Sequence, residues 1–315
     1  MRKLPKLVDV LLETPGNIAW DDDYPVFVKK LAAHADDPEM QKFIGAGHKD
    51  GDPKDDRFKT KPENIAVADL IPTQNEIDID KSLGWPMKKD PSSFIKFSKG
   101  NGPFLVGADP IIVLNKTHIL DGHHRWSQVY AINRDAELKV QNINKPGLDP
   151  HDALKSIQAA VALKTGEVKV AEVKGANMLQ MSKDDLEEWI GKKVNMKFFA
   201  TIGSNKEIME ILRKKTSDLN EADDVDESDF RDAQNLVLNC IWKNVESMQK
   251  TSQPIAGATP RGFMPQTDDV DWEAPLQTGQ VDIAEPHAKM KEGSSDADDE
   301  LVMERWLKLS GLLKG

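Results

Sequence analysis

Apolar residues recur at different spacings along the chain, and these spacings separate a strand-forming middle from helical flanks. Near the N-terminus five of them fall on one helical stripe: Leu4, Leu7, Val8, Leu11 and Leu12. Repeats of three and four residues are typical of an amphipathic helix, and Pro15-Gly16 ends this one. We therefore predict a helical arm over residues 1–60 that packs against a neighbouring part of the chain or against a partner.

Short apolar runs alternate with turns over residues 61–148. Strand-like runs occupy residues 65–67, 70–71, 110–114, 117–120 and 138–143. Asn115-Lys116 separates two of these runs and predicts a β-hairpin, and an insertion over residues 78–104 interrupts the series. After the hairpin, apolar residues at helical spacing predict one helix over residues 123–133. This mixture of elements predicts an α+β fold whose core is a small mixed sheet.

Helical spacing returns after the predicted sheet and is followed by a stretch without any period. Residues 149–250 contain several apolar stripes, and Ser182 with Asp185 is typical of a helix start. Residues 251–299 are rich in Pro, Gly, Thr and Asp, which predicts a flexible acidic linker. The spacing of apolar residues predicts a final amphipathic helix over residues 300–315, and we expect such a terminal helix to dock on a protein partner or back on its own domain.

Composition narrows the class of protein. The 315 residues carry a net charge of −11 at pH 7 and include one cysteine, Cys240. A single cysteine excludes a disulfide scaffold and a cysteine-based zinc module, and no apolar run reaches the roughly 18 residues that cross a membrane. The net charge does not support DNA as a partner. We expect a soluble, cytoplasmic protein with no membrane partner.

The most informative run lies in residues 61–148, the one segment without an acidic excess: Ile119-Leu120-Asp121-Gly122-His123-His124-Arg125-Trp126. A buried strand leads into a glycine, and a helix starts immediately after it. The first N–H groups of a helix have no intrahelical partner and bind anions, most often phosphate. Gly122 allows close approach of the backbone, and Arg125 can donate two hydrogen bonds to phosphate oxygens. His123 and His124 can donate further bonds, and Asp121 can hold Mg²⁺ or orient a water molecule.

Three runs of this segment occur together: Asp121-Gly122-His123-His124-Arg125, Pro110-Ile111-Ile112-Val113 and Leu70-Ile71-Pro72-Thr73-Gln74. In this combination the chain resembles the ParB/sulfiredoxin superfamily over about residues 64–145. That group includes ParB partition proteins, sulfiredoxins and free-serine kinases. The resemblance implies that a nucleotide, ATP or CTP with Mg²⁺, lies over the turn and the helix start. It implies phosphate contacts from Gly122, His124 and Arg125, with Gln74 facing the nucleotide.

Departures from the patterns of this superfamily narrow the choice among its members. Sulfiredoxins place a reactive cysteine where this chain has His123, which excludes their chemistry here. ParB partition proteins have a Glu-Arg-Arg style box after the glycine, where this chain has His-His-Arg. The motif is closest to that of the free-serine kinases, whose catalytic Glu is replaced here by Thr73-Gln74. An amide cannot act as a general base, so Glu76, on the same side of a strand as Gln74, is the candidate substitute.

We therefore expect a ParB-like nucleotide-binding protein that hydrolyses a nucleoside triphosphate or transfers its phosphoryl group. The predicted catalytic residues are Asp121, His123 and Glu76. The predicted nucleotide contacts are Gln74, Gly122, His124 and Arg125, and the predicted metal ligand is Asp121.

Three alternatives remain. One is a non-catalytic module of a phage or plasmid assembly, in which the ParB-like core is degenerate and the terminal amphipathic helices capture a partner. A chain with this core and acidic flanks is what we expect in a phage or another mobile element, and its compartment would then be the host cytoplasm. The second is a DNA-binding, ParB-like nuclease. The third is a metal site built from His118, His123 and His124.

Overall fold

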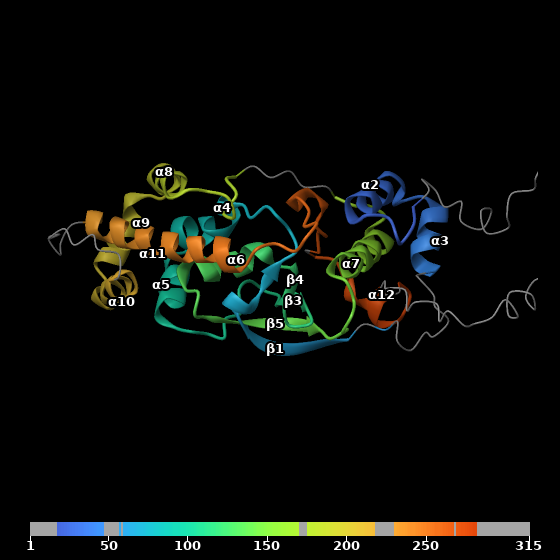
Figure 1. Ribbon diagram of the computed structural model, residues 1–315, viewed down its shortest axis with the longest axis horizontal. Coiled ribbons are helices and arrows are strands. Elements are labelled where there is room, and N and C mark those ends of the chain that lie inside the picture. Colours follow the sequence, from blue (N-terminus) through green and yellow to red (C-terminus); the bar gives the residue numbers. More distant parts are fainter. Residues whose placement is uncertain are drawn as a thin grey trace, which may run out of the picture.

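The computed structural model describes residues 18–46, 57, 59–169, 175–217, 230–267 and 269–281 (Figure 1). The helices predicted over residues 4–12 and 300–315 lie outside these ranges, as does the predicted linker beyond residue 281. None of the helices within the described ranges is both long and apolar enough to cross a membrane.

A five-stranded mixed sheet lies between two groups of helices. Its strands, in chain order, are β1 (Thr60–Ala66), β2 (Ile71–Pro72), β3 (Ile111–Leu114), β4 (His118–Asp121) and β5 (Glu137–Ile143). In space they follow the order β1-β5-β3-β4-β2. The pairs β1–β5 and β3–β4 are antiparallel, whereas β3–β5 and β2–β4 are parallel. The predicted α+β class with a mixed sheet is confirmed.

The hairpin that joins β3 to β4 forms at the predicted turn. Asn115 and Lys116 both have positive φ, 51° and 64°, which is the backbone of a two-residue turn whose twist matches the flanking strands. The Asn115 side chain accepts a hydrogen bond from the Lys145 N–H and donates one to the Lys145 carbonyl, each at 2.8 Å. These bonds offset the steric cost of the left-handed conformation.

Helices cover both faces of the sheet. One hydrophobic cluster contains α4 (Ile79–Ser82), the π-helical turn η3 (Trp85–Lys89), α5 (Pro91–Lys99), α6 (His123–Ile132), α8 (Lys183–Lys193), α9 (Met196–Gly203), α10 (Lys206–Thr216) and α11 (Phe230–Thr251). The other contains α2 (Tyr24–His34), α3 (Pro38–Ala46), α7 (Pro150–Thr165) and α12 (Glu273–Gln277). Two 3₁₀ turns complete the described elements: η2 (Val67–Asp69) and η4 (Arg261–Phe263).

Strand β3 shows why the sheet is buried on both faces. Its side chains alternate, so Ile111 and Val113 join the first cluster while Ile112 and Leu114 join the second. Four consecutive apolar residues are typical of such a doubly covered strand. Figure 1 shows α6 and α11 on one side of the sheet and α7 with α2 on the other.

Two features that the sequence predicts in the helical regions can be compared with the structure: the start of α8 and the N-terminal arm. The capping box predicted at the start of α8 is present, with the Ser182 hydroxyl accepting from the Asp185 N–H at 3.1 Å and the Asp185 carboxylate accepting from the Ser182 N–H at 2.8 Å. The described part of the N-terminal arm is helical and packs on the chain's own α7. Gln41 donates there to the Ala162 carbonyl at 3.0 Å.

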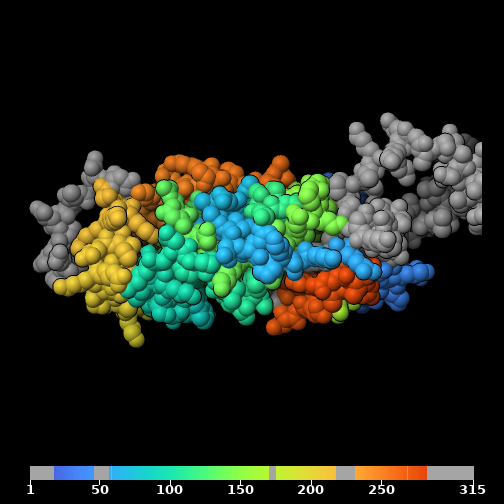
Figure 2. All heavy atoms as spheres, turned by 90° about the horizontal axis from the view of Figure 1, so that it is seen from below, coloured from blue at the N-terminus to red at the C-terminus, as the bar shows by residue number. Residues whose placement is uncertain are grey.

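The chain after α11 packs against the molecule instead of forming the predicted linker. Residues 252–267 and 269–281, called the C-terminal strap below, contain the buried residues Met264, Trp272, Leu276 and Val281. Their intervals follow no helical or strand period, so the polar composition of the segment dominated the prediction. Figure 2 shows the end of the strap, in red-orange, lying against the surface beside the light-blue chain of β1.

Hydrogen bonds attach the strap to two parts of the fold. The Asn75 N–H donates to the Thr259 carbonyl at 3.0 Å, next to the loop that follows β2. The Phe263 carbonyl accepts from the Tyr24 hydroxyl at 2.7 Å and from the Gln158 side chain at 2.8 Å. The strap therefore lies beside the loop that contains Gln74.

Candidate functional site

The turn between β4 and α6 requires a glycine. Gly122 has φ 91° and ψ 24°, a left-handed conformation that costs other residues free energy. A Cβ atom at this position would lie 2.9 Å from Ile111 Cγ1 and 3.1 Å from Arg125 Nε. The N-cap of α6 is Gly122, which has no side chain that could cap the first turn, and the first N–H groups of a helix can bind an anion.

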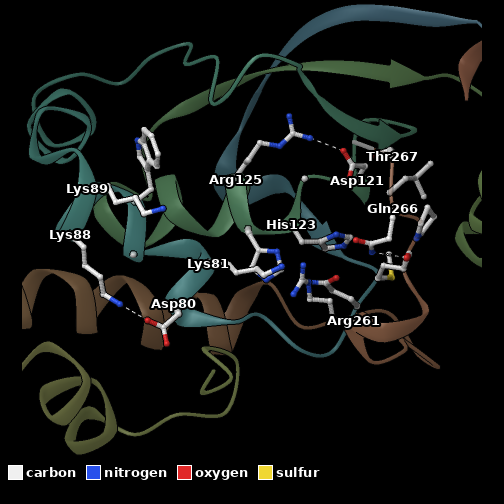
Figure 3. A pocket seen from close by; sticks show the side chains of 18 residues that line it. Asp80, Lys81, Lys88, Lys89, Asp121, His123, Arg125, Arg261, Gln266 and Thr267 are labelled. Carbon is white, nitrogen blue, oxygen red and sulfur yellow. Dashed lines mark hydrogen bonds and ion pairs between the residues drawn. The ribbon is translucent and has the colours of Figure 1, made fainter. Parts of the chain in front are cut away.

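The guanidinium of Arg125 lies over this glycine. Its Nη2 donates to Asp121 Oδ2 at 2.6 Å, and its Nη1 donates to the Asp109 carbonyl. The side chains of Arg125 and Asp121 are each 24% exposed, so solvent and ligands reach the pair. The structure thus brings Asp121, Gly122 and Arg125 together at the start of α6 (Figure 3).

The two histidines of the motif are buried hydrogen-bond acceptors. His123 Nε2 accepts the Thr73 N–H at 3.1 Å, and His124 Nε2 accepts the Asp78 N–H at 3.2 Å. Because a backbone N–H only donates, neither Nε2 is protonated. Burial lowers the pKa of His123 well below its usual range. Burial, with the nearby Arg261 and Lys81, lowers the pKa of His124 to about 3.

These contacts give the histidines a positioning function in the structure. They fasten the loop between β2 and α4 to the start of α6, and both rings are neutral near pH 7. His124 Nε2 therefore presents a lone pair to the Asp78 N–H, and not a proton to an anion. The ring of His123 directs the same nitrogen at Thr73.

Gln74, predicted to face the nucleotide, and Glu76, predicted to replace the catalytic Glu, have different surroundings. Gln74 is buried, lines the cavity described below, and donates through Nε2 to the Glu76 carbonyl at 2.8 Å. The Glu76 carboxylate accepts the Arg261 N–H of η4 at 3.1 Å and does not line that cavity. The structure therefore brings Gln74 to the site and uses Glu76 to hold the strap.

A cavity of about 540 Å³ opens in front of the turn. Its walls come from the start of α6, the loop with Gln74, residues 80–89 of the insertion, and strap residues 261–267. Figure 3 shows Lys88 and Lys89 at one end of the cavity, Arg261 with Gln266 and Thr267 at the other, and Arg125 between them. We call this space the basic cavity.

Positive charge dominates the walls of the basic cavity. Five basic residues line it, against two acidic ones: Lys81, Lys88, Lys89, Arg125 and Arg261, with Asp80 and Asp121. Lys88 pairs with Asp80, and Arg125 pairs with Asp121. In a chain of net charge −11, this local reversal favours an anionic ligand.

Several wall residues carried no signal in the sequence. Arg261 is buried to 9% exposure and reaches the cavity only because the strap folds back across the loop after β2. Its neighbours in the chain have the composition of a linker, so no motif marks it. Lys81 belongs to the insertion over residues 78–104 and has no motif of its own. Trp85 differs, because the sequence places it in a cluster of lysines and aromatic residues that predicts a segment covering the pocket or a loop facing nucleic acid.

A second cavity of about 500 Å³ adjoins the first and has the opposite charge. It shares Asp121, Arg125 and Thr267 with the basic cavity, and its other acidic wall residues are Asp109, Asp269, Asp271 and Glu273. Burial raises the pKa of Glu273, and the charges of Asp271 and Asp109 raise it further. We call this space the acidic cavity.

Comparisons with known proteins leave the site to be interpreted from its geometry. No protein-family model matches the chain, and neither a curated protein nor a solved structure does. The likeness to the ParB/sulfiredoxin superfamily stays a prediction from the sequence motif. Among the described residues, no three His, Cys, Asp or Glu side chains gather as metal ligands.

Proposed function

We propose that the basic cavity binds the polyphosphate of a nucleotide, ATP or CTP with Mg²⁺, and that the protein hydrolyses this nucleotide or transfers its phosphoryl group. The observation that carries the proposal is the convergence at the first turn of α6. There Arg125 lies over Gly122, in a cavity with an excess of basic side chains. Uncapped helix N–H groups beside a guanidinium form a strong anion site.

Each wall residue has a role in this proposal. Gly122 lets phosphate oxygens approach the first N–H groups of α6. Arg125 exchanges its bond to Asp121 for bonds to phosphate. Arg261, from the strap, and Lys81, from α4, add positive charge at the cavity wall. His124 holds the loop that positions Gln74 and is not itself a phosphate ligand in this arrangement.

Asp121 suits a metal ion that is already bound to phosphate. Mg²⁺ keeps several waters and is typically held by one or two carboxylates together with phosphate oxygens, which agrees with a single acidic side chain at the turn. When Arg125 turns to the phosphate, the Asp121 carboxylate can exchange this 2.6 Å contact for contact with the ion. The ion would neutralise charge that develops on the phosphate.

Phosphoryl transfer would proceed by breaking the bond from the terminal phosphorus to its bridging oxygen. The same phosphorus forms a bond to a water or a substrate hydroxyl, whose proton leaves to solvent. Gln74 can orient that water or hydroxyl through its amide, although the amide cannot accept its proton. Glu76 reaches the acceptor only by releasing the Arg261 N–H.

Calorimetry on the purified full chain tests the proposal. Titrations with ATP, CTP, ADP and CDP, each with Mg²⁺, should show binding, with the triphosphates tighter than the diphosphates because they place more charge at the cavity wall. Phosphate release or labelling of an acceptor measures the catalytic part separately. Absence of binding by all four nucleotides at millimolar concentration would overturn the proposal.

One observation favours a second candidate function, a non-catalytic interaction module. Arg125 is already satisfied within the chain by Asp121 and the Asp109 carbonyl, which is the arrangement expected of a site that has become structural. The variant Arg125→Ala separates the two functions. It should abolish nucleotide binding if the site is active, and it should leave capture of a protein partner unchanged if the core is only a scaffold.

A further inference from the structure

Trp85 is an aromatic side chain exposed at the wall of the basic cavity. Four large apolar side chains of the described residues are exposed, and Trp85 is the one aromatic residue among them, with 52% of its surface accessible. It lines the cavity beside Gly84 and Lys89. Burying the large apolar surface of an indole is favourable. A ligand that covers this exposed ring would therefore gain binding free energy.

The backbone that presents Trp85 is firmly held. Residues Pro86 and Met87 of the same turn, η3, are buried in the core, and the Asp90 N–H donates to the Trp85 carbonyl at 2.8 Å. A π-helical turn is rare and occurs often at functional sites. The ring is therefore held on a fixed support, so little conformational entropy is lost when it contacts a ligand.

A second pair of tryptophan and lysine nearby shows what a structural pair looks like. Trp189 is 7% exposed and donates through Nε1 to Asp80 at 3.3 Å, while Lys88 lies over its ring at 4.9 Å and pairs with Asp80. The Trp85 side chain also hydrogen-bonds a carboxylate, that of Asp90, but the ring is far more exposed than that of Trp189. Lys89 Nζ lies 5.8 Å from the centre of its ring, a loose contact that a ligand can replace.

We infer that Trp85 is the platform on which the base of the bound nucleotide stacks, which makes it the residue that selects nucleotides over other polyphosphates. This inference rests on the proposed function of the basic cavity. The phosphates lie at the start of α6, and the base lies at the end of the cavity formed by η3 (Figure 3). Stacking of one base on an aromatic side chain typically changes affinity by about 10-fold.

The experiment compares ATP with inorganic triphosphate, each with Mg²⁺, by calorimetry on the full chain. Wild-type protein should bind ATP about 10-fold more tightly than triphosphate. The variant Trp85→Ala should lose that advantage and keep its triphosphate affinity, and Trp85→Phe should retain part of it. Met196→Ala is the matched control, because Met196 is 51% exposed and lies outside the cavity, at the start of α9.

Tryptophan fluorescence provides a readout that a merely structural role would not change. ATP should quench the emission of the wild-type protein, triphosphate should not, and Trp85→Phe should remove the quenching by ATP. Equal affinity of the wild type for ATP and triphosphate would overturn the stacking inference and leave the phosphate site intact. The inference also fails if Trp85→Ala binds ATP like the wild type, or if it weakens both ligands equally. Failure of both ligands to bind would instead remove the proposed function itself.

Discussion

The basic and acidic cavities share a wall and differ in the sign of their charge. Both include Asp121 and Arg125, yet five basic residues line one cavity and five acidic residues line the other. The boundary between them contains the ion pair of 2.6 Å between these two side chains, together with Thr267. The comparison teaches that positive charge in this acidic protein is a local feature, because basic side chains gather on one side of this ion pair and carboxylates on the other.

The same comparison identifies Arg125 as the residue whose loss should change the charge of both cavities most. Without Arg125, the Asp121 carboxylate would lose its ion pair with the guanidinium, and both cavities would present more negative charge at their common wall. An anion would then meet repulsion where it now meets attraction. Substitutions in this ion pair should therefore change ligand affinity more than substitutions that affect only one of the two cavities.

Replacing Arg125 by alanine should produce the largest effect on binding. We expect nucleotide affinity to fall by at least about 100-fold, because removing a charged hydrogen-bond donor from a partly buried pair costs several kcal/mol. Calorimetry with Mg²⁺-ATP measures the change. Arg134→Ala is the control, since Arg134 is exposed and pairs with Asp135 outside both cavities. Equal affinities of the two variants would show that the boundary pair does not govern binding.

Acid should destabilise the fold through the two buried histidines. The folded pKa of His124 is about 3 and that of His123 is also lowered, so the unfolded chain takes up protons first as the pH falls below about 6.5. Stability is therefore present above pH 6.5 and is lost as the pH falls toward 3, and the loss from His124 alone is about 2 kcal/mol at pH 5. Urea titrations at pH 7 and pH 5 measure this loss.

A variant distinguishes the contribution of His124 to the acid-induced loss of stability from that of other titrating groups. His124→Gln keeps an acceptor for the Asp78 N–H but cannot be protonated in this range, so it should lose less stability between pH 7 and pH 5 than the wild type. An identical pH dependence in the two proteins would contradict a neutral, buried His124. Neither ring gains charge in the folded state over this range, so a change in nucleotide affinity between pH 7 and pH 5 should follow the protonation of the ligand's own phosphate.

Alanine at position 122 should affect both stability and the boundary pair. The positive φ and the 2.9 Å approach to Ile111 predict a loss of about 1 to 2 kcal/mol, measured by urea unfolding. The added methyl group also lies 3.1 Å from the guanidinium, so affinity should fall with stability. Gly191→Ala is the control: nothing lies within 4 Å of a Cβ there, in the interior of α8. That change should be neutral or slightly stabilising.

The sequence was sufficient for those parts of the fold and site that depend on neighbouring residues. The hairpin at Asn115-Lys116 and the capping box at Ser182 are local patterns, and both are present. The strand, glycine and helix around Gly122 also depend on neighbours, so the convergence of Asp121 and Arg125 could be predicted. The anion-binding capacity of this turn could be predicted because the helix start and the arginine lie within a few residues of each other in the sequence.

Features that depend on distant partners could not be read from the sequence. The burial and low pKa of His124 arise from contacts with Asp78 and Arg261, which no periodicity reveals. The strap was predicted as a linker because its buried residues have no common spacing. For this reason Arg261 could not be recognised as a residue of the site. The acidic cavity was missed for the same reason, since the strap supplies Glu273 and Asp271.

The smallest effect should come from the acidic cavity, with Glu273→Gln. The folded pKa of Glu273 is raised, so the folded protein holds this proton more readily than the unfolded chain, and stability falls as the pH rises above the ordinary pKa of about 4.5. The variant should therefore show a higher Tm than the wild type at pH 7, with the difference shrinking toward pH 4. Nucleotide affinity should rise by no more than about 3-fold, because solvent screens a charge outside the basic cavity. A larger gain in affinity would mean that the two cavities act electrostatically as one, and that the ion pair of Arg125 and Asp121 does not separate them.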